Sequence, residues 1–217
     1  MAGLDPSKIH TTISVLISSF ELLGKVVNLG KRVARGFSNE GVYEVLNYET
    51  TVEILDPEGR KAKIDKKETI RFLQDGIAAI EDEAWGDGKY LIDYKVSPGR
   101  LADTYRLGYR SVVLISLREV KNKGDIDTFN ISWRMENGFL RKNEQWETKV
   151  NHRTRQLQIA IVLPRNRAPK RAHLVEVHKK LSRPLKTSKQ LADGRWIISA
   201  EIDRPQLFEN YMIKWDW

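Results

Sequence analysis

The chain has 217 residues, of which 41% are hydrophobic, and a mean hydropathy of −0.49, which excludes a wholly disordered chain and fits one large domain with or without an appendage. It contains no cysteine, which excludes disulfides, thiolate zinc sites and a cysteine nucleophile. The net charge of +8 favours anionic partners such as nucleic acid, anionic lipid or an acidic protein, although a basic protein can also simply stay soluble.

Residues 9–35 carry the one long helical pattern of the sequence, which begins after the capping candidates Asp5 and Ser7 and ends at Gly36. Two apolar stripes leave only a narrow polar strip, whereas a surface helix that covers one core needs a single stripe. We therefore expect this helix to be buried on most sides. The first stripe is Ile9, Ile13, Leu16, Phe20, Leu23 and Val27, and the second is Val15, Leu22, Val26, Leu29 and Val33.

Two alternatives remain open for this helix: it acts on a membrane or in assembly, or it packs on a sheet or in a homo-oligomeric bundle. Residues 9–30 would extend roughly 33 Å, about the thickness of the bilayer hydrocarbon. Glu21 and Lys25 argue against a permanent span, since each charge costs about 2.5–3.5 kcal/mol at a helix centre. The following cations suit an anionic membrane surface; they are Lys31, Arg32 and Arg35.

The first residues are not expected to form a signal peptide, because Lys8 is the only cation before the apolar run and no small-residue cleavage site follows. We expect a cytoplasmic protein that associates with a membrane on activation. The helical segment 1–37 is followed by a short linker at 38–41.

From Val42 onward the apolar residues alternate with a period of two, which predicts a β domain over 42–217. We expect about nine or ten short strands in an antiparallel β-sandwich, immunoglobulin-like or jelly-roll-like, because no βαβ alternation is visible. A central hairpin is predicted from the buried strand at 111–117 and the alternating strand at 129–133. The segments 61–64 and 68–73 are expected to be separate strands, and Tyr211, Ile213, Trp215 and Trp217 to share one face of the last strand.

No catalytic motif is present. The four histidines, His10, His152, His173 and His178, lack the spacing of a metal site. The acidic group of Glu81, Asp82, Glu83 and Asp87 could bind a hard cation, but without the regular spacing of a calcium loop we expect solvated loop charges. We therefore predict no enzyme activity, no cofactor and no metal.

The strongest charge asymmetry lies between Arg153 and Lys189, where eleven cations and one acid, Glu176, give +10. Such a patch can hold nucleic-acid phosphates, which makes a nucleic-acid-binding module the alternative function. It lacks the interleaved aromatic residues of single-strand binders, and it could equally hold anionic lipid or an acidic protein. Its cations are Arg153, Arg155, Arg165, Arg167, Lys170, Arg171, Lys179, Lys180, Arg183, Lys186 and Lys189.

Gly3-Leu4-Asp5-Pro6 and the apolar helix up to Leu29 resemble the N-terminal helix of cell-death and innate-immune effector domains, such as the HeLo type and fungal receptor N-termini. The resemblance implies a first helix that acts on membranes or forms assemblies. Those families continue as helical bundles, whereas this chain turns to strands at Val42. We predict a non-enzymatic interaction or assembly protein, plausible as a defence effector, whose partners are protein, a second copy of itself or an anionic membrane.

Overall fold

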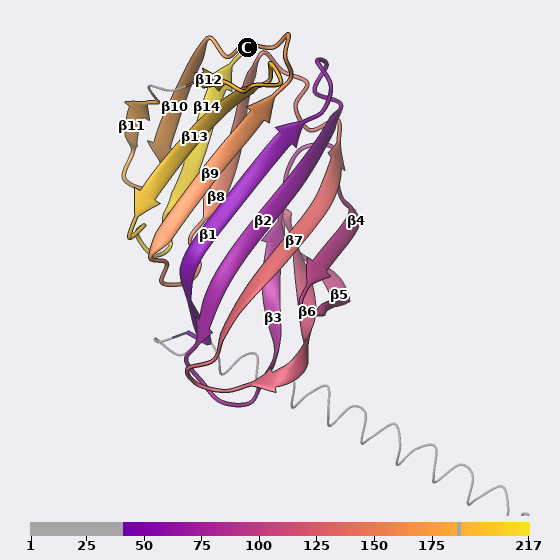
Figure 1. Ribbon diagram of the computed structural model, residues 1–217, viewed down its shortest axis with the longest axis vertical. Coiled ribbons are helices and arrows are strands. Elements are labelled where there is room, and N and C mark those ends of the chain that lie inside the picture. Colours follow the sequence, from indigo (N-terminus) through magenta and orange to yellow (C-terminus); the bar gives the residue numbers. More distant parts are fainter. Residues whose placement is uncertain (1–40, 186–187) are drawn as a thin grey trace, which may run out of the picture. The chain divides into compact units, whose positions relative to one another are not determined.

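The computed structural model describes residues 41–185 and 188–217 (Figure 1). The chain divides into two compact units, Met1–Val42 and Tyr43–Trp217. The predicted helix and the cations that follow it, Lys31, Arg32 and Arg35, lie outside the described residues, as does Lys186. The described residues contain strands and turns but no helix, which confirms the predicted β character of this part of the chain.

The second unit, called the β domain below, is built on a seven-stranded sheet with the strand order β12-β13-β9-β1-β2-β7-β4. All neighbouring pairs in this sheet are antiparallel except β1 and β9, which run parallel. The strands are β1 (Tyr43–Ile54), β2 (Lys61–Phe72), β4 (Lys89–Ser97), β7 (Ile126–Glu136), β9 (Gln156–Leu163), β12 (Ser188–Gln190) and β13 (Trp196–Asp203).

Two smaller antiparallel sheets lie behind the seven-stranded sheet in Figure 1, one behind β13, β9 and β1 and the other behind β2 and β7. The four-stranded sheet has the order β11-β10-β14-β8 and consists of β8 (Asn143–Lys149), β10 (Arg171–Glu176), β11 (Leu181–Pro184) and β14 (Asn210–Asp216). The three-stranded sheet has the order β3-β6-β5 and consists of β3 (Ile77–Ala84), β5 (Arg100–Leu107) and β6 (Arg110–Lys121).

The core lies between the large sheet and the two small ones, because alternate residues of each strand turn inward. Ile64 and Ile70 of β2 are fully buried, and their neighbours in sequence on the other face are exposed or partly exposed. Tyr211, Ile213 and Trp215 of the last strand and Trp217, which follows it, are buried as predicted, but Met212 between them is buried as well and interrupts the alternation. The outward face of the large sheet is polar, as in a sheet with one solvated face.

The predicted central hairpin is wrong. β6 pairs with β3 and β5 in the three-stranded sheet, whereas β7 pairs with β2 and β4 in the seven-stranded sheet. The connection 122–125 therefore crosses from one sheet to the other. Alternation in the two segments correctly identified strands, but it holds no information about which strand each one pairs with.

Two other local predictions also fail for a common reason. The segments 61–64 and 68–73 are not separate strands, because β2 runs without a break from Lys61 to Phe72. Lys66, between the two segments, faces inward and is only 8% exposed. The acidic group at 81–83 lies within β3 rather than in a loop, and its central member, Asp82, is 6% exposed. Both errors come from taking a charged residue as a mark of solvent exposure.

Candidate functional site

The structure separates the predicted basic patch into two groups at opposite ends of the β domain. Arg155 directly precedes β9 and Arg165 follows it, so the eight residues of this strand separate them by about 26 Å at a strand's usual rise. Arg165 shares its end with Arg167, Lys170 and Arg171, whereas Arg155 shares the other end with Arg153, Lys179 and Lys180. Arg183 and Lys189 lie on the short strands β11 and β12.

At the first of these ends, the cations hold chain segments together. The guanidinium of Arg167 lies 4.3 Å from the centre of the Trp217 ring and donates from Nε to the carbonyl of Pro57. Arg171 pairs with Asp216 through Nε at 2.8 Å. Lys170 donates to the backbone oxygen of Trp217 at 3.3 Å. These contacts join the start of β10 to the end of β14 and to the β1–β2 turn, which is a structural role.

The opposite end consists of three connections, 150–155, 177–181 and 204–209, which we call the cationic end. Its cations are all exposed, and the only acid within these three segments, Glu209, is 1% exposed. The cationic end therefore presents five exposed cations to solvent, and the exposed carboxylate next to it is that of Asp203, the last residue of β13. Its cations are Arg153, Arg155, Lys179, Lys180 and Arg204.

Glu209 fixes the turn at 177–180 to the start of β14. Its carboxylate accepts hydrogen bonds from the backbone N–H groups of His178 at 2.8 Å, Asn210 at 2.8 Å and Lys179 at 3.2 Å, and it contacts Nδ1 of His178 at 3.0 Å. Burial alone would raise the pKa of Glu209, but these N–H donors hold its pKa below the usual value. The negative charge of Glu209 is thus stabilised by these hydrogen bonds inside the domain.

Backbone hydrogen bonds join the three connections into one surface. Phe208 N donates to Val150 O at 2.7 Å, and Arg204 N donates to Arg155 O at 2.7 Å. Arg155 N in turn donates to the carbonyl of Val45, near the start of β1, at 2.9 Å. Elements from the large sheet and from the four-stranded sheet therefore meet here in a fixed arrangement.

Two large apolar side chains project from the cationic end: Phe208 is 62% exposed and Leu181 is 56% exposed. Phe208 also has a φ of 66°, in the left-handed region that a bulky residue rarely adopts. Lys180 and Arg204, with φ values of 55° and 46°, share this conformation. Backbone strain of this kind concentrates at functional positions. Sequence reasoning found four of the cations but neither Phe208 nor Arg204, which lie outside the charged stretch.

A second group of polar residues is buried between β2, β3 and β4. Lys66 Nζ donates to Asp82 Oδ1 at 2.6 Å and to the carbonyl of Glu83 at 3.0 Å, and it lies 4.8 Å from the centre of the Trp133 ring. Tyr94 donates its hydroxyl hydrogen to Asp82 Oδ2 at 3.1 Å. The acidic residue that the sequence offered as a cation ligand therefore already has a cation, and the described residues include no group of His, Asp and Glu that could hold a metal ion.

Two further groups near this cluster have displaced pKa values. Burial raises the pKa of Glu68 to about 7, although the charge of Lys66 acts in the opposite direction. Burial lowers the pKa of His152 to about 4, and its ring stacks on Tyr43 with 4.1 Å between the ring centres. At neutral pH His152 is uncharged, which agrees with a structural histidine.

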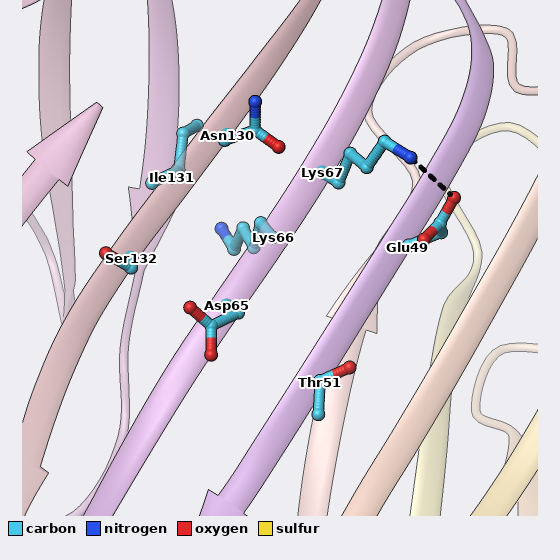
Figure 2. A pocket seen from close by; sticks show the side chains of 8 residues that line it. All are labelled: Glu49, Thr51, Asp65, Lys66, Lys67, Asn130, Ile131 and Ser132. Carbon is cyan, nitrogen blue, oxygen red and sulfur yellow. Dashed lines mark ion pairs between the residues drawn. The ribbon is translucent and has the colours of Figure 1, made fainter. Parts of the chain in front are cut away.

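The outward face of the large sheet has a shallow hollow of about 220 Å³ (Figure 2). Two rows of opposed residues cross β1, β2 and β7 here, namely Thr51, Asp65 and Ser132, and Glu49, Lys67 and Asn130. Lys67 pairs with Glu49 at 3.7 Å, and both side chains remain well exposed. Ile131 and the buried Lys66 also line the hollow, but Lys66 is already paired with Asp82 and no aromatic residue lines the hollow, which therefore has the character of a solvated sheet face.

No family model matches the chain, and no curated protein matches it. Among solved structures, the chain is similar to an M1 zinc metallopeptidase from Deinococcus radiodurans, at 7% identity and a TM-score of 0.47. It is also similar to a mutant of that peptidase bound to a Tyr-Ser-Ala substrate, at 8% identity and a TM-score of 0.47, and to a mutant of a two-domain M1 zinc metallopeptidase bound to L-tryptophan, at 8% identity and a TM-score of 0.48. In each case 79% of this chain is covered but only 42% of the peptidase. At these values the likeness assigns neither family nor activity.

Proposed function

We propose that this is a non-enzymatic protein whose N-terminal segment engages an anionic membrane or drives assembly, with the β domain as the body attached to it. The width of the apolar surface of residues 9–33 carries the proposal, because these residues form two apolar stripes where one core needs a single stripe. A membrane or a second copy of the chain would cover the additional stripe. The resemblance of residues 3–29 extends the proposal to a defence or cell-death effector.

The contacts of the buried ionisable groups support a non-enzymatic role. Lys66, Asp82 and Tyr94 would be the first candidates for acid–base chemistry, and each is bonded to another member of the group. A catalytic group needs a reachable substrate atom within hydrogen-bonding distance. Of these three residues only Lys66 lines the hollow on the outward face, and its Nζ is already hydrogen-bonded to Asp82 and to the carbonyl of Glu83.

Leakage of dye from anionic vesicles tests the membrane part of the proposal. We expect leakage with the full chain and none with a chain that begins at Ser38. Within the full chain, Leu16→Ser with Leu23→Ser should abolish leakage, because it interrupts one apolar stripe. The matched control, Ser14→Asn with Ser18→Asn, changes only the polar strip and should leave leakage intact. Equal leakage from the full and shortened chains, or none from either, contradicts membrane engagement.

Size-exclusion chromatography tests the assembly part separately. The full chain should elute as an oligomer, and the chain that begins at Ser38 as a monomer, because the shortened chain lacks both stripes. If the two chains show the same number of subunits at equal concentration, the segment does not drive assembly.

A further inference from the structure

We infer that the cationic end of the β domain is a lipid-docking surface that holds anionic phospholipid headgroups, with Phe208 and Leu181 entering the boundary between headgroups and acyl chains. This inference rests on the proposed membrane engagement and adds the part of the β domain that meets the lipid. Three properties of this end support it: exposed cations, exposed apolar side chains and a backbone held by hydrogen bonds.

The charge of this surface is available to a partner. The side chains of Arg153, Lys180 and Arg204 form no hydrogen bond or ion pair with any described residue, and all three are exposed. Arg155 shares the carboxylate of Glu44 with Arg71, and Lys179 pairs with Glu176 at 2.8 Å. Because Glu209 is enclosed by N–H donors, it does not offset the exposed cations at the surface. An anionic phospholipid surface provides the complementary charge.

The opposite end also has exposed leucines, Leu55 at 49% and Leu140 at 57%, whereas the cationic end has an exposed phenylalanine held in a left-handed conformation. Phe208 belongs to the connection 204–209 and Leu181 begins β11, and the cations of the cationic end lie in the same three connections. Aromatic and aliphatic side chains of this size partition into the interfacial layer of a bilayer, while neighbouring Lys and Arg side chains bind the headgroups. A purely solvated charged end gives no reason for a 62% exposed Phe in a left-handed conformation.

Fixed geometry makes the surface ready for docking. The hydrogen bond from Phe208 N to Val150 O and the ring of N–H donors around Glu209 hold the two apolar positions in place before any lipid arrives. Less conformational freedom is then lost on binding. The same end contains the start of β1, since Arg155 N bonds to Val45 O and Val45 N bonds to Arg153 O.

Lipid fits the surface better than nucleic acid does. Proteins that bind single strands stack successive bases on several aromatic rings, and double-stranded DNA is usually read by a helix or a strand pair in a groove. The cationic end contributes one exposed aromatic ring and one exposed aliphatic side chain, and its residues are in turns and connections. Nucleic-acid binding is therefore treated as a competing outcome of the experiments.

A fluorescent label at Phe208 tests the inference directly. The chain contains no cysteine, so Phe208→Cys can be labelled at a single site with an environment-sensitive dye. Leu140→Cys is the matched control, because Leu140 is 57% exposed and follows β7 at the opposite end. With vesicles containing phosphatidylserine, we expect a blue shift from the label at position 208 and none from the label at 140. Vesicle-bound protein without a shift at 208 overturns the inference while leaving the proposed function intact.

Charge reversal supplies an independent measurement on the full chain. Arg153→Glu with Lys180→Glu should weaken binding to phosphatidylserine vesicles by about tenfold or more, since each cation near such a surface contributes about 1 kcal/mol. The control, Arg60→Glu with Lys142→Glu, makes the same charge change at the opposite end and should weaken binding far less. Equal losses from the two pairs would mean that only net charge matters, which overturns a localised surface.

The remaining outcomes separate this inference from the proposed function. If the Leu16→Ser and Leu23→Ser variant still gives a blue shift at position 208 on anionic vesicles but causes as much leakage as the unmodified chain, the surface binds lipid and the helix proposal alone fails. If neither the full chain nor this variant associates with vesicles, both proposals fail. If the label at position 208 responds to a single-stranded or double-stranded oligonucleotide but not to vesicles, the surface binds nucleic acid and the lipid inference is wrong.

Discussion

Lys66 of β2 and Asp82 of β3 connect the seven-stranded and three-stranded sheets through a 2.6 Å ion pair whose two side chains are 7% and 5% exposed. Removing one partner of a buried ion pair strongly destabilises a protein, because the other charge then remains buried without a partner. The carbonyl of Glu83, the Trp133 ring and the Tyr94 hydroxyl also contact the pair, and Tyr48 and Glu68 interact electrostatically with Lys66.

Removing one partner of this pair should destabilise the β domain much more than removing both. We expect Lys66→Met or Asp82→Leu alone to lower the free energy of unfolding by about 3–5 kcal/mol. The combined variant should recover most of that loss, since two apolar side chains of similar volume can replace the pair. Urea unfolding followed by tryptophan fluorescence measures the three values. Additive losses in the combined variant would show that the pair is not coupled.

Glu68 and His152 should give opposite pH dependences of stability. The pKa of Glu68 is raised to about 7 in the folded protein, so its contribution is present at low pH and is lost as the pH rises through about 7. The pKa of His152 is lowered to about 4, so its contribution is present above the usual histidine pKa and is lost as the pH falls towards 4. In the unmodified protein the two effects partly cancel between these values.

Single substitutions should separate the two effects. In His152→Gln, stability should fall as the pH rises from about 5 to about 7, with a slope of up to about 1.4 kcal/mol per pH unit. In Glu68→Gln, stability should instead rise over the same range. Urea unfolding at several pH values measures both slopes, and identical profiles for the two variants would exclude this assignment.

Glu209 should be needed for the order of the turn at 177–180. Glu209→Ala leaves three backbone N–H groups without their acceptor and should cost about 1–3 kcal/mol. Glu209→Gln retains one acceptor oxygen and should lose less. Glu201→Ala on the outward face of β13 is the control and should change stability by less than about 0.5 kcal/mol. Hydrogen exchange at His178 and Lys179 reports the local effect; unchanged exchange in Glu209→Ala would show that the carboxylate does not hold the turn.

The left-handed backbone conformation of Phe208 should lower the stability of the β domain. At its φ of 66°, a glycine is free of the strain that a side chain with a Cβ causes, about 1–2 kcal/mol. We therefore expect Phe208→Gly to melt at a higher temperature than Phe208→Ala, although both remove the exposed ring. Both variants should also bind anionic vesicles less well than the unmodified chain. A glycine variant that melts below the alanine variant would contradict the strain.

Sequence periodicity was sufficient to find β9, β13 and β14, in which apolar and polar residues alternate over part of the strand. It was not sufficient for β5, whose eight residues are all exposed and follow no apolar pattern, so this strand was missed. Partner strands could not be found either, since the parallel pairing of β1 with β9 depends on tertiary packing and has no local mark in either segment.

Only part of the cationic end could be predicted from the sequence, for a related reason. A run of cations is visible in a sequence, but the run from Arg153 to Lys189 passes along β9 and back along β10 and so contributes to both ends of the domain. Phe208 and Arg204 come from a different part of the chain and join this surface only through folding. Their left-handed backbone conformations are properties of the folded loop that composition does not reveal.

The parallel pairing of β1 with β9 also bears on how the domain is made. Tyr48 lies opposite Leu157, so more than one hundred residues must be synthesised after β1 before its second neighbour exists. Contacts so distant in sequence form slowly, since a large loop has to close first. During translation the first hairpin, β1 with β2, waits with the edge of β1 open, and an open strand edge can pair with another chain.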